Sequence, residues 1–480
     1  MSKEITRREF LKGSLYAAAG MAAMYTLGGG IFDFGGAEAA AGTSDLTSLA
    51  IARDMTKCIG CGKCVEICTD MQGLDILEMA QNNGKSVSSL KYGYSDLSQT
   101  KCIGCGQCAR ACPSGAITVR DGLTAVNEAL ADSSRCIVWQ FAPSVQHVLG
   151  EEFRILSGED VSGKIAAAAK LLGGYAYRTD FGADITIMEE SEEFIKCFNS
   201  GEKKPFMTSC CPGWINYVEK THPELIPNLS SCKSPMEMLG ALIKDYLPKK
   251  YNVNAADIFH IAVMPCTAKK HEANRNNMLV DNIRAVDAVI TIAEFKNLLL
   301  SKGINLAALE NEEFDSLFDG TSGSGRIFGA SGGVCESALR TVYFKLTGNE
   351  APNIEFSELR GSSGIKTTEV VIDEKTIRAC VVNGIKNIQT IAQDIANGVC
   401  PYDLIEVMAC PGGCAGGGGT PYLFTDAGIR QHGMYAYDRK SSIRASHKNE
   451  TLQKIYDDYL SSPCSELAEE LLHTEYFDLT

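Results

Sequence analysis

Residues Glu406–Gly419 have the sequence Glu-Val-Met-Ala-Cys-Pro-Gly-Gly-Cys-Ala-Gly-Gly-Gly-Gly, and we expect the rest of the chain to serve this stretch. Cys410 and Cys414 lie four residues apart on a turn that is rich in glycine. Because glycine adopts backbone conformations that other residues avoid, such a turn can approach a bulky inorganic group closely. Two thiolates on the turn could hold two neighbouring metals, or one metal and a bridge. The alternative is a surface turn with two inert thiols. Other motifs in the sequence are needed to distinguish this alternative from a metal-binding turn.

Two further cysteine motifs lie upstream. One is Thr208–Trp214 (Thr-Ser-Cys-Cys-Pro-Gly-Trp), and the other is Met264–Lys269 (Met-Pro-Cys-Thr-Ala-Lys). Together the three motifs supply five thiols, which are Cys210, Cys211, Cys266, Cys410 and Cys414. A single 4Fe–4S cubane needs four thiolates, so one thiol is spare. The surplus indicates reaction chemistry rather than plain electron storage.

The composition is that of an ordinary folded protein with two or three domains. The chain has 480 residues, of which 45% are hydrophobic and 22% are charged, enough for a substantial core. The formal net charge of −14 argues against nucleic acid as a partner, since phosphate binding needs clustered lysine and arginine. An acidic protein suits a basic partner instead, because opposite long-range fields steer the two together.

Residues 1–41 resemble a twin-arginine signal peptide, which directs folded proteins out of the cytoplasm. Thr6–Lys12 (Thr-Arg-Arg-Glu-Phe-Leu-Lys) precedes a mild apolar run from Gly13 to Phe32, and small residues follow. A membrane anchor is the alternative, since about 20 apolar residues can span a bilayer. The run is poor in Leu and Ile, so we expect cleavage after Ala39 or Ala41 and a periplasmic location.

Eight of the twenty cysteines form an internal repeat within residues 50–122. The sequence Lys-Cys-Ile-Gly-Cys-Gly opens both copies. Three thiolates at i, i+3 and i+6 wrap one cubane, and a fourth, further along, ligates the other cluster. We therefore predict a ferredoxin-like domain with two 4Fe–4S clusters. The first cluster would be bound by Cys58, Cys61, Cys64 and Cys112, and the second by Cys102, Cys105, Cys108 and Cys68.

Zinc is the alternative for this repeat, because Cys-x-x-Cys pairs also bind that ion. The doubled register of eight cysteines favours iron–sulfur clusters. Pro113 follows the second copy as in bacterial ferredoxins, whereas Thr69 takes the equivalent place in the first. Between the copies, the segment from Met71 to Thr100 is expected to be an insertion that carries a loop.

Residues 134–424 alternate short apolar runs with amphipathic stretches. We expect strands at Ile137–Phe141, Ile258–Met264 and Leu404–Met408, and helices at Lys164–Leu172, Ala293–Leu300 and Glu336–Tyr343. This alternation predicts an α/β domain with mainly parallel sheets, in which ligands collect at the carboxyl ends of the strands. Two of the three cysteine motifs directly follow predicted strands and would lie at such an end.

Two remaining stretches carry weaker signals. Gly325–Gly333 is rich in glycine, but it lacks the Gly-Lys-Ser/Thr ending of a phosphate loop and follows no clear strand, so we expect no nucleotide site there. Residues 425–480 are polar and helical in pattern, and we expect them to wrap around the main domain. Their histidines, His447 and His473, are expected at the surface or at helix caps rather than as metal ligands.

On the three motifs Thr208–Trp214, Met264–Lys269 and Glu406–Gly419, the sequence closely resembles the iron-only (FeFe) hydrogenases. The resemblance covers nearly the whole chain after residue 41. It implies a two-lobed catalytic domain that holds the H-cluster, a 4Fe–4S cubane joined through a cysteine sulfur to a two-iron unit with CO, cyanide and a dithiolate bridge. In relatives with split chains, a small subunit carries a helical tail like residues 425–480. We therefore expect a single, monomeric chain with that subunit fused.

The resemblance also implies roles for the five thiols. The cubane ligands would be Cys211, Cys266, Cys410 and Cys414. Of these, Cys414 would bridge to the di-iron unit. Cys210 would then be the unligated thiol that passes protons to the bridge.

Four further residues would contact the di-iron unit in the same resemblance. Lys269 would donate a hydrogen bond to a cyanide as a compact positive charge. Met264 and Met408 would pack against the unit as soft, adaptable side chains. Ser144, in the stretch Ala142-Pro143-Ser144, matches a serine that also approaches cyanide.

The family relays protons from the cysteine through a carboxylate, a serine and a second carboxylate. Glu190, Ser230 and Glu193 match this pattern in residue type and in their offsets from Cys210. A thiol and two carboxylic acids can exchange protons near neutral pH if burial raises the carboxyl pKa. The alternative is a solvated charge run at a helix start, because four glutamates cluster at residues 189–193. Lys196-Cys197 stand where some relatives have a surface arginine that ends the relay.

The resemblance implies reversible oxidation of H2 to protons and electrons. Relatives exported in this way resemble uptake enzymes that reduce basic multihaem c-type cytochromes, and a ferredoxin is the alternative carrier. Separate maturation proteins would have to build the di-iron unit. The competing classes are a hydrogen sensor or iron–sulfur assembly protein of the same superfamily, which typically lacks the relay cysteine, and an electron-transfer protein with cubanes alone. The presence of both Cys210 and Cys211 argues against these classes.

Seven cysteines remain outside these motifs. They are Cys136, Cys197, Cys232, Cys335, Cys380, Cys400 and Cys464. Free cysteine behaves as a small buried hydrophobe, and we expect this state for most of them. Disulfides are the alternative in an exported protein.

Overall fold

The computed structural model describes residues 44–480, apart from residues 83, 203, 363, 373 and 422–425. The predicted export signal therefore lies outside the described residues. Among the helices of the described part, none combines the length and the apolar character that crossing a bilayer requires.

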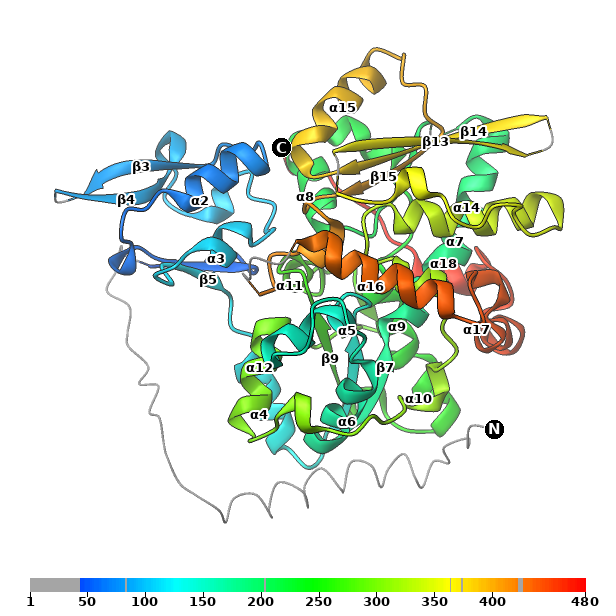
Figure 1. Cartoon of the computed structure of the whole chain (residues 1–480), viewed down its shortest axis with the longest axis horizontal. Coiled ribbons are helices and arrows are strands. Elements are labelled where there is room, and N and C mark those ends of the chain that lie inside the picture. Colours follow the sequence, from blue (N-terminus) through cyan, green and yellow to red (C-terminus); the bar gives the residue numbers. More distant parts are fainter. Residues whose placement is uncertain (1–43, 83, 203, 363, 373, 422–425) are drawn as a thin grey trace.

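One four-stranded parallel sheet forms the framework of the lower lobe in Figure 1, in the order β12–β9–β6–β7. Its strands are β6 (Cys136–Phe141), β7 (Tyr175–Arg178), β9 (Ile258–Met264) and β12 (Ala288–Thr291). Gln140 of β6 lies opposite Ala262 of β9 on one side and Tyr177 of β7 on the other. All six residues of β6 are buried, as expected for a parallel strand that is covered on both faces.

A second sheet forms the upper lobe, in the order β13–β14–β15–β8. Its strands are β8 (Phe206–Met207), β13 (Ile365–Ile372), β14 (Lys375–Asn383) and β15 (Leu404–Met408). The pairs β14–β15 and β15–β8 are parallel, and only the edge strand β13 runs antiparallel. The prediction of an α/β fold with mainly parallel sheets is thereby confirmed.

Helices cover both faces of each sheet. The first sheet packs against α4 (Leu123–Ala131), α6 (Ser162–Leu172) and α12 (Ile292–Ser301) on one face, and α9 (Pro235–Lys244) and α10 (Tyr246–Tyr251) on the other. The second packs against α14 (Gly333–Thr347) on one face, and α8 (Pro212–Thr221) and α15 (Ile388–Ala396) on the other. The three predicted strands and the three predicted helices are all present, with ends shifted by a few residues. The helix α12 begins at a capping box, in which Thr291 and Glu294 satisfy each other's backbone N–H groups.

The long helix α7 (Thr179–Ser200) is shared by the two lobes. Phe181 and Ile185 pack into the core of the first sheet, whereas Ala183 and Ile187 pack into the core of the second. Residues two apart lie on different sides of a helix, so one helix can serve two cores. Because both sides are occupied, most of α7 is buried, including polar positions.

The N-terminal region lies beside the two lobes (Figure 1) and contains two small antiparallel sheets. The first sheet is made of β1 (Ser44–Asp45), β2 (Ile51–Asp54) and β5 (Ile117–Val119). The second is a hairpin of β3 (Leu77–Asn82) and β4 (Lys85–Leu90), so the expected loop-bearing insertion is a β-hairpin. Only a few apolar residues, such as the paired Leu77 and Leu90, are buried there. This sparse pattern explains why the sequence did not predict the strands.

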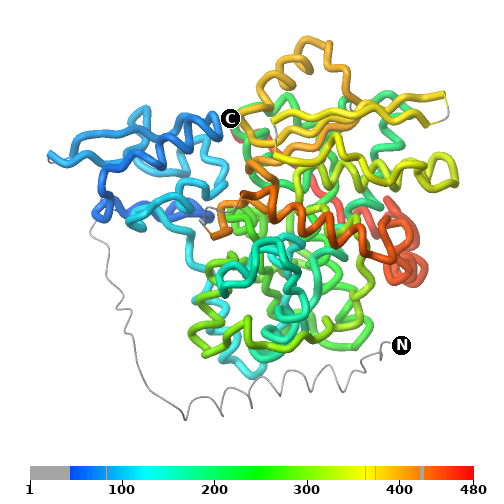
Figure 2. Tube along the Cα trace, in the orientation of Figure 1, coloured from blue at the N-terminus to red at the C-terminus, as the bar shows by residue number. Residues whose placement is uncertain are grey.

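The C-terminal region is largely helical, as its polar pattern predicts, and its described residues include three α-helices. They are α16 (Ala427–Lys440), α17 (Glu450–Ile455) and α18 (Glu466–Leu472). The helix α16 runs across the junction of the two lobes in Figure 1. In the view of Figure 2 the chain then passes through the red helices and ends between the N-terminal region and the upper lobe. Near its end, the N–H of Leu479 donates to the carbonyl of Glu219.

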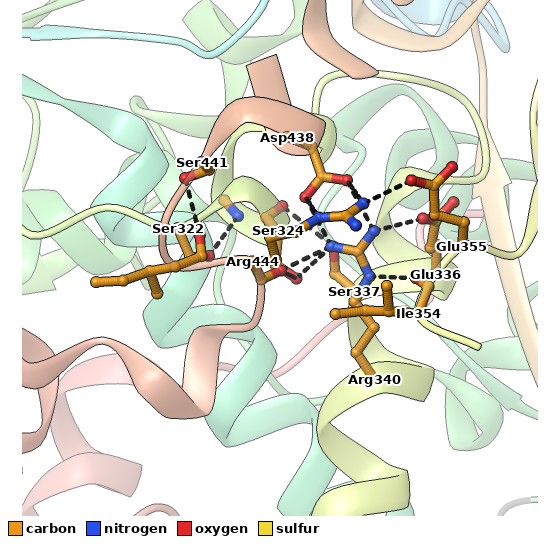
Figure 3. Close-up of polar contacts among 12 residues, drawn as sticks. Ser322, Ser324, Glu336, Ser337, Arg340, Ile354, Glu355, Asp438, Ser441 and Arg444 are labelled. Carbon is orange, nitrogen blue, oxygen red and sulfur yellow. Dashed lines mark hydrogen bonds and ion pairs between the residues drawn. The ribbon is translucent and has the colours of Figure 1, made fainter. Parts of the chain in front are cut away.

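A buried cluster of charges joins this region to the upper lobe (Figure 3). The Arg340 guanidinium of α14 donates two hydrogen bonds, 2.9 and 3.0 Å long, to the two carboxylate oxygens of Asp438 in α16. Arg340 also donates to Glu336, and Arg444 donates to Asp438. A bidentate pair between guanidinium and carboxylate fixes the relative orientation of the two side chains in addition to matching their charges. The C-terminal helices are therefore anchored to the lobe with a defined orientation.

Candidate active site

Four loops that leave strand ends converge on one cavity between the lobes. In the lower sheet, β6 and β9 are parallel neighbours whose carboxyl ends lie at the same edge. In the upper sheet, β15 and β8 stand in the same relation. Ligand sites in open α/β sheets form at such carboxyl ends. Here two sheets contribute, so residues more than 250 positions apart in the sequence share one site.

Every residue predicted to contact the H-cluster lies in the wall of this cavity. These residues are Ser144, Cys210, Cys211, Met264, Cys266, Lys269, Met408, Cys410 and Cys414. The rest of the wall is mostly Pro, Met, Gly and Phe. The structure thus brings the five thiols of the three motifs together.

The cavity fits a polyatomic group rather than a single ion. Its volume is about 70 Å³, measured as the space open to the centre of a water-sized sphere, whereas one water needs only roughly 10–15 Å³ on that measure. Four of the five thiols in its wall are enough to ligate a cubane. Ser144 is a second indication that the cavity holds a group, because its buried hydroxyl has no hydrogen-bond partner among the described residues. A buried polar group of this kind indicates a ligand acceptor in the cavity.

Local structure explains how Cys211 is held. Cys211 is the residue before α8, and Pro212 occupies the first position of that helix, where its missing N–H costs nothing. The Cys211 sulfur accepts the N–H of Ala409 from the opposite motif at 3.5 Å. This contact ties the first cysteine motif to the third.

The glycines of the third motif allow close approach to the N-terminal region. A Cβ atom on Gly418 would lie 2.0 Å from the carbonyl oxygen of Cys105, and one on Gly417 would lie 2.3 Å from that of Pro265. Gln107 donates a hydrogen bond of 2.8 Å to the carbonyl of Gly416. Glycine is therefore required here so that two backbones can touch. The surface-turn alternative does not hold, because the turn is packed between two parts of the protein.

The repeated cysteines of the N-terminal region line two smaller cavities. Cys68, Cys102, Cys105 and Cys108 line one cavity. Cys58, Cys61, Cys64 and Cys112 line the other. The former lies next to the glycine contact just described, and the latter includes Cys61, which is exposed.

Lys269 points its charge toward the thiols. Its ammonium lies 3.3 Å from the carbonyl oxygen of Cys210 and 2.7 Å from the carboxylate of Glu272. Burial alone would lower the pKa of Lys269, but the charge and hydrogen bond of Glu272 raise it above its usual value. Lys269 therefore stays protonated in the cavity wall, where it can donate to an anion.

Cys210 and Glu190 form a buried pair beside the cavity. Burial, followed by the nearby Glu190 charge, raises the pKa of the Cys210 thiol well above its ordinary value. Burial, followed by the charge of Glu193, also raises the pKa of Glu190 to about 8. Neither Glu190 oxygen has a partner within hydrogen-bond distance among the described residues, although Ser230 and the Ser209 backbone lie near enough to lower this pKa slightly. A carboxyl group poised near neutral pH suits proton transfer.

Ser230 and Glu193 lie in direct contact behind this pair. The Ser230 hydroxyl donates to Glu193 Oε2 at 2.8 Å. Both residues are buried, and Ser230 has no exposed surface. Glu189, Glu190 and Glu193 all lie in the middle of α7 and are buried, so the alternative of a solvated charge run is wrong. Only Glu192 of that run is partly exposed.

Several residues of the cavity wall were not predicted from the sequence. Phe328 and Gly329 come from the glycine-rich stretch that we considered only as a phosphate loop, and Pro235 and Met236 begin α9. No spacing rule marks these residues, because they contribute backbone and apolar surface. The available signal was the glycine content of Gly325–Gly333, because glycine lets a loop between two helices pass close to a bound group.

The prediction for His447 needs correction, whereas His473 is the C-cap residue of α18, as the prediction of a helix-cap position allowed. His447 is buried and stacks on Phe344 with ring centroids 4.2 Å apart. The His473 side chain is only 9% exposed and lies 3.1 Å from Glu189 Oε2. His447 is buried because it packs against α14, whereas His473 remains partly exposed at its contact with α7.

No disulfide joins the cysteines of the described residues, so the disulfide alternative finds no support. Five of the seven remaining cysteines are buried, as expected, and Cys400 and Cys464 are half-buried.

Comparison with known families agrees with this geometry. Residues 135–418 match the family described as "Iron only hydrogenase large subunit, C-terminal domain", residues 428–479 match "Iron hydrogenase small subunit", and residues 57–116 match "4Fe-4S dicluster domain". The chain is thus similar to a large subunit and a small subunit in one polypeptide.

Individual relatives give the same result. The chain is 38% identical to iron hydrogenase 1 of Clostridium pasteurianum over 443 residues, which is 90% of this chain and 76% of the relative. It is 38% identical to the periplasmic Fe hydrogenase large subunit of Nitratidesulfovibrio vulgaris over 302 residues, 62% of this chain and 72% of the relative. A solved structure of a variant of the FeFe hydrogenase HydA1 from Chlamydomonas reinhardtii shares 36% identity and superposes with a TM-score of 0.66, covering 74% of this chain and 98% of that one. The resemblance inferred from the sequence is confirmed: the chain belongs to the FeFe hydrogenases, oxidoreductases whose cofactors are 4Fe–4S clusters and the H-cluster.

Proposed function

We propose that this hydrogenase works in the periplasm in the direction of H2 oxidation and delivers electrons to a basic c-type cytochrome, with a ferredoxin as the alternative acceptor. We also propose the division of labour along the chain. Residues 50–122 hold two 4Fe–4S clusters, residues 134–424 hold the H-cluster, and residues 425–480 serve as the fused small subunit of a monomer. Residues 1–41 are the export signal in this proposal.

We assign the ligands of the H-cluster to the four thiols that share the cavity with Lys269 and Ser144. They are Cys211, Cys266, Cys410 and Cys414. When bound, the cluster supplies the metal at which H2 is split and the first acceptor of its electrons. The chain orients it: Met264 and Met408 provide soft apolar contacts, while Lys269 and Ser144 provide donors to its anionic ligands.

The proton side is carried by side chains of this chain. The Cys210 thiol, kept protonated by burial, takes up and releases a proton at the cavity wall. Glu190 accepts that proton, and Ser230 connects it to Glu193 through the hydrogen bond of 2.8 Å. The apolar wall keeps other proton donors and bulk water away, so the relay controls how protons reach and leave the cavity.

The electron side follows from the contact between the third motif and Cys105. The cavity lined by Cys68, Cys102, Cys105 and Cys108 lies next to the catalytic loop. The cavity of the other four repeated cysteines lies beyond it and includes the exposed Cys61. Electrons would therefore leave the protein near Cys61, where an acceptor can dock.

Charge and similarity support the choice of acceptor and compartment. The formal net charge of −14 favours a basic partner. The Arg7-Arg8 pattern near the start of the chain resembles a twin-arginine signal, and one relative is a periplasmic hydrogenase subunit.

One observation carries the enzyme assignment over an assembly or sensing role. Cys210 is the fifth thiol of the cavity, and a buried carboxyl group with a pKa of about 8 lies behind it. A protein that only stores or transfers a cluster needs neither group. Their combination is what proton-coupled chemistry in a closed cavity requires.

The test is to produce the full chain anaerobically together with hydrogenase maturation proteins. Infrared spectra should show CO and cyanide bands, and H2 should reduce methyl viologen. H2-dependent reduction should be faster with a basic c-type cytochrome than with a ferredoxin, and its rate should fall as ionic strength rises. The absence of CO and cyanide bands from the matured protein would contradict its assignment as an enzyme. A faster reaction with ferredoxin, or a rate that does not change with ionic strength, would contradict the proposal of a basic cytochrome as acceptor.

A further inference from the structure

A second set of hydrogen bonds begins at Glu193, where the proposed proton relay reaches the far side of α7. Ser230 donates to one Glu193 oxygen, and the hydroxyl of the next residue, Ser231, lies 3.2 Å from the other oxygen. The same Ser231 hydroxyl lies 2.8 Å from Nδ1 of His473. The chain of contacts therefore continues from Glu193 through Ser231 to a histidine of the C-terminal region.

Backbone pairing places His473 at this point. Cys232 and His473 form an isolated antiparallel bridge. On either side of it, the N–H of Thr474 donates to the carbonyl of Ser231 at 2.7 Å, and the N–H of Lys233 donates to that of Leu472 at 2.8 Å. These bonds fix the segment that follows α18 against the segment that carries the relay serine. The position of the imidazole is thus set by the fold rather than by a flexible tail.

Glu189 holds the other side of the imidazole. Its Oε2 lies 3.1 Å from His473 Nε2 and accepts the backbone N–H of Cys464 at 2.6 Å. Its Oε1 accepts the hydroxyl of Tyr456 at 2.6 Å. The Cys464 N–H and the Tyr456 hydroxyl both donate to this carboxylate, which indicates an acceptor-only, ionised group, so Nε2 of the neutral imidazole carries the hydrogen that faces it. Nδ1 is then free to accept a proton from Ser231.

We propose that His473 is the outlet of the proton relay, that Ser231 connects it to Glu193, and that Glu189 orients the imidazole and stabilises its protonated form. The inference rests on the proposed function, since it extends the relay from Cys210 through Glu190, Ser230 and Glu193. It supplies an exit for a chain in which Lys196-Cys197 stand at the sequence position of the surface arginine of some relatives.

The proton transfer balances within this set of groups. During H2 oxidation, the Glu193 carboxylic acid gives its proton to the Ser231 oxygen while the Ser231 hydroxyl gives its own proton to His473 Nδ1. Glu193 becomes a carboxylate, Ser231 is unchanged, and His473 becomes an imidazolium beside the Glu189 carboxylate. The imidazolium then gives one N–H proton to water or buffer, and in H2 evolution the same steps run backwards.

Position and chemistry favour a histidine outlet. Ser230 and Glu189 have no exposed surface, whereas Glu193 and the His473 side chain are each 9% exposed, so exposed surface begins at Glu193 and continues to His473. Imidazole is the side chain whose ordinary pKa lies closest to neutral pH, so it can load and unload a proton without large cost. A carboxylate partner that fixes its tautomer is a common device for such a histidine.

A metal site is the other interpretation of these side chains. Ligand atoms of Glu189, Cys464 and His473 lie within 4.8 Å of one another. The Glu189 oxygen that faces the histidine already accepts the Cys464 N–H, and the Cys464 sulfur contacts the Glu189 carbonyl at 3.7 Å. These groups satisfy one another. In the second set within the same distance, Glu193, Cys232 and His473, Glu193 accepts the Ser230 hydroxyl at 2.8 Å and His473 Nδ1 faces the Ser231 hydroxyl at 2.8 Å. Both sets therefore favour a proton-transfer network over a metal site.

The test compares His473→Gln, Ser231→Ala and Glu193→Gln in the matured full chain. We expect each of the first two to slow H2 oxidation about tenfold or more and to raise the solvent deuterium isotope effect. Added imidazole should restore the rate of His473→Gln, because a diffusing base can replace the lost outlet. The iron content and the infrared bands should match those of the parent.

His447→Gln is the matched control, because this second C-terminal histidine is also packed against a ring and a glutamate but has no contact with the relay. It should keep the parent rate and isotope effect. Parent rates in both His473→Gln and Ser231→Ala, with Glu193→Gln inactive, would place the outlet elsewhere and leave the proposed function intact. Parent activity in Glu193→Gln would instead remove the relay itself. A slow His473→Gln that imidazole does not restore, beside a fully active Ser231→Ala, would show a structural role and overturn the inference.

Discussion

Ser230 Oγ and Glu193 Oε2 lie 2.8 Å apart in the closed interior, although 37 residues separate them in the sequence. The pair joins the segment that follows α8 to the middle of α7. This contact supplies the connection from the cavity side to Glu193.

Glu193→Gln should therefore block proton passage without disturbing the cofactors. The amide keeps the size of the side chain but cannot take up and release a proton, so we expect turnover to fall by about 10²-fold or more. H2-dependent viologen reduction measures the loss. Glu192→Gln is the control, since Glu192 is partly exposed and pairs with Lys345 at the surface. Equal losses in the two variants would contradict a specific relay.

The pKa of Glu190 sets the pH dependence. Glu190 must be ionised to accept a proton in H2 oxidation and protonated to supply one in H2 evolution. With its pKa raised to about 8 by burial and by Glu193, oxidation should rise with pH through about 8 while evolution falls over the same range. Rates of H2 oxidation and of H2 evolution, measured between about pH 6 and pH 10, test this rise and this fall. Profiles that stay flat through about pH 8 would show that Glu190 is not part of the path.

Cys210→Ala should separate catalysis from cofactor binding. The variant removes the thiol that faces the cavity but leaves the four cysteines that we assign as ligands. We expect turnover to be lost, while iron content and the CO and cyanide infrared bands remain. Cys197→Ala, at a buried thiol outside the cavity wall, serves as the control. Turnover at the parent rate in Cys210→Ala would contradict the proton side of the mechanism.

Gly418→Ala should loosen the contact between the catalytic loop and the N-terminal region. An added Cβ would lie 2.0 Å from the Cys105 carbonyl oxygen, so one backbone has to move. We expect slower reduction of a protein acceptor by H2, with the infrared bands preserved. Gly428→Ala is the matched change, because its Cβ would make only ordinary contacts near 3.4 Å. Unchanged electron delivery in Gly418→Ala would show that this contact does not set the rate.

Asp438→Asn should unfold the C-terminal anchor. Burial alone would raise the pKa of Asp438, but hydrogen bonds and charges from Arg340 and Arg444 hold it below its usual value. Removing one partner of a buried ion pair costs about 3–5 kcal/mol, which a lower melting temperature would reveal. Because the folded pKa is depressed, the parent should keep this stability at neutral pH and lose it only as pH falls below about 4. Asp457→Asn, at an exposed position of the same region, should leave the melting temperature unchanged.

The main elements of the fold could be predicted because their signals are local. Ile258–Met264 and Leu404–Met408 are continuous apolar runs that end at a cysteine motif, and buried parallel strands have this pattern. The repeated cysteines were equally clear, since cluster ligation fixes their spacing.

The surroundings of the relay could not be predicted from local patterns. Glu189 and Glu190 belong to a charge run, and such runs are usually solvated. They are buried here because α7 packs into two cores at once, which is a property of the whole fold. His473 meets Glu189 only through the pairing of residues 231–233 with the end of the chain, and no sequence spacing encodes that contact.

The anchoring of α16 through Asp438 and Arg340 also bears on how this hydrogenase behaves on dilution. Where a small subunit is a separate chain, its docking obeys mass action and weakens as the protein becomes scarce. Here the two parts belong to one polypeptide, so their effective concentration is set by the linking segment and does not change with the amount of protein. Catalysis per molecule should therefore stay constant down to the lowest concentrations at which the cofactors remain bound.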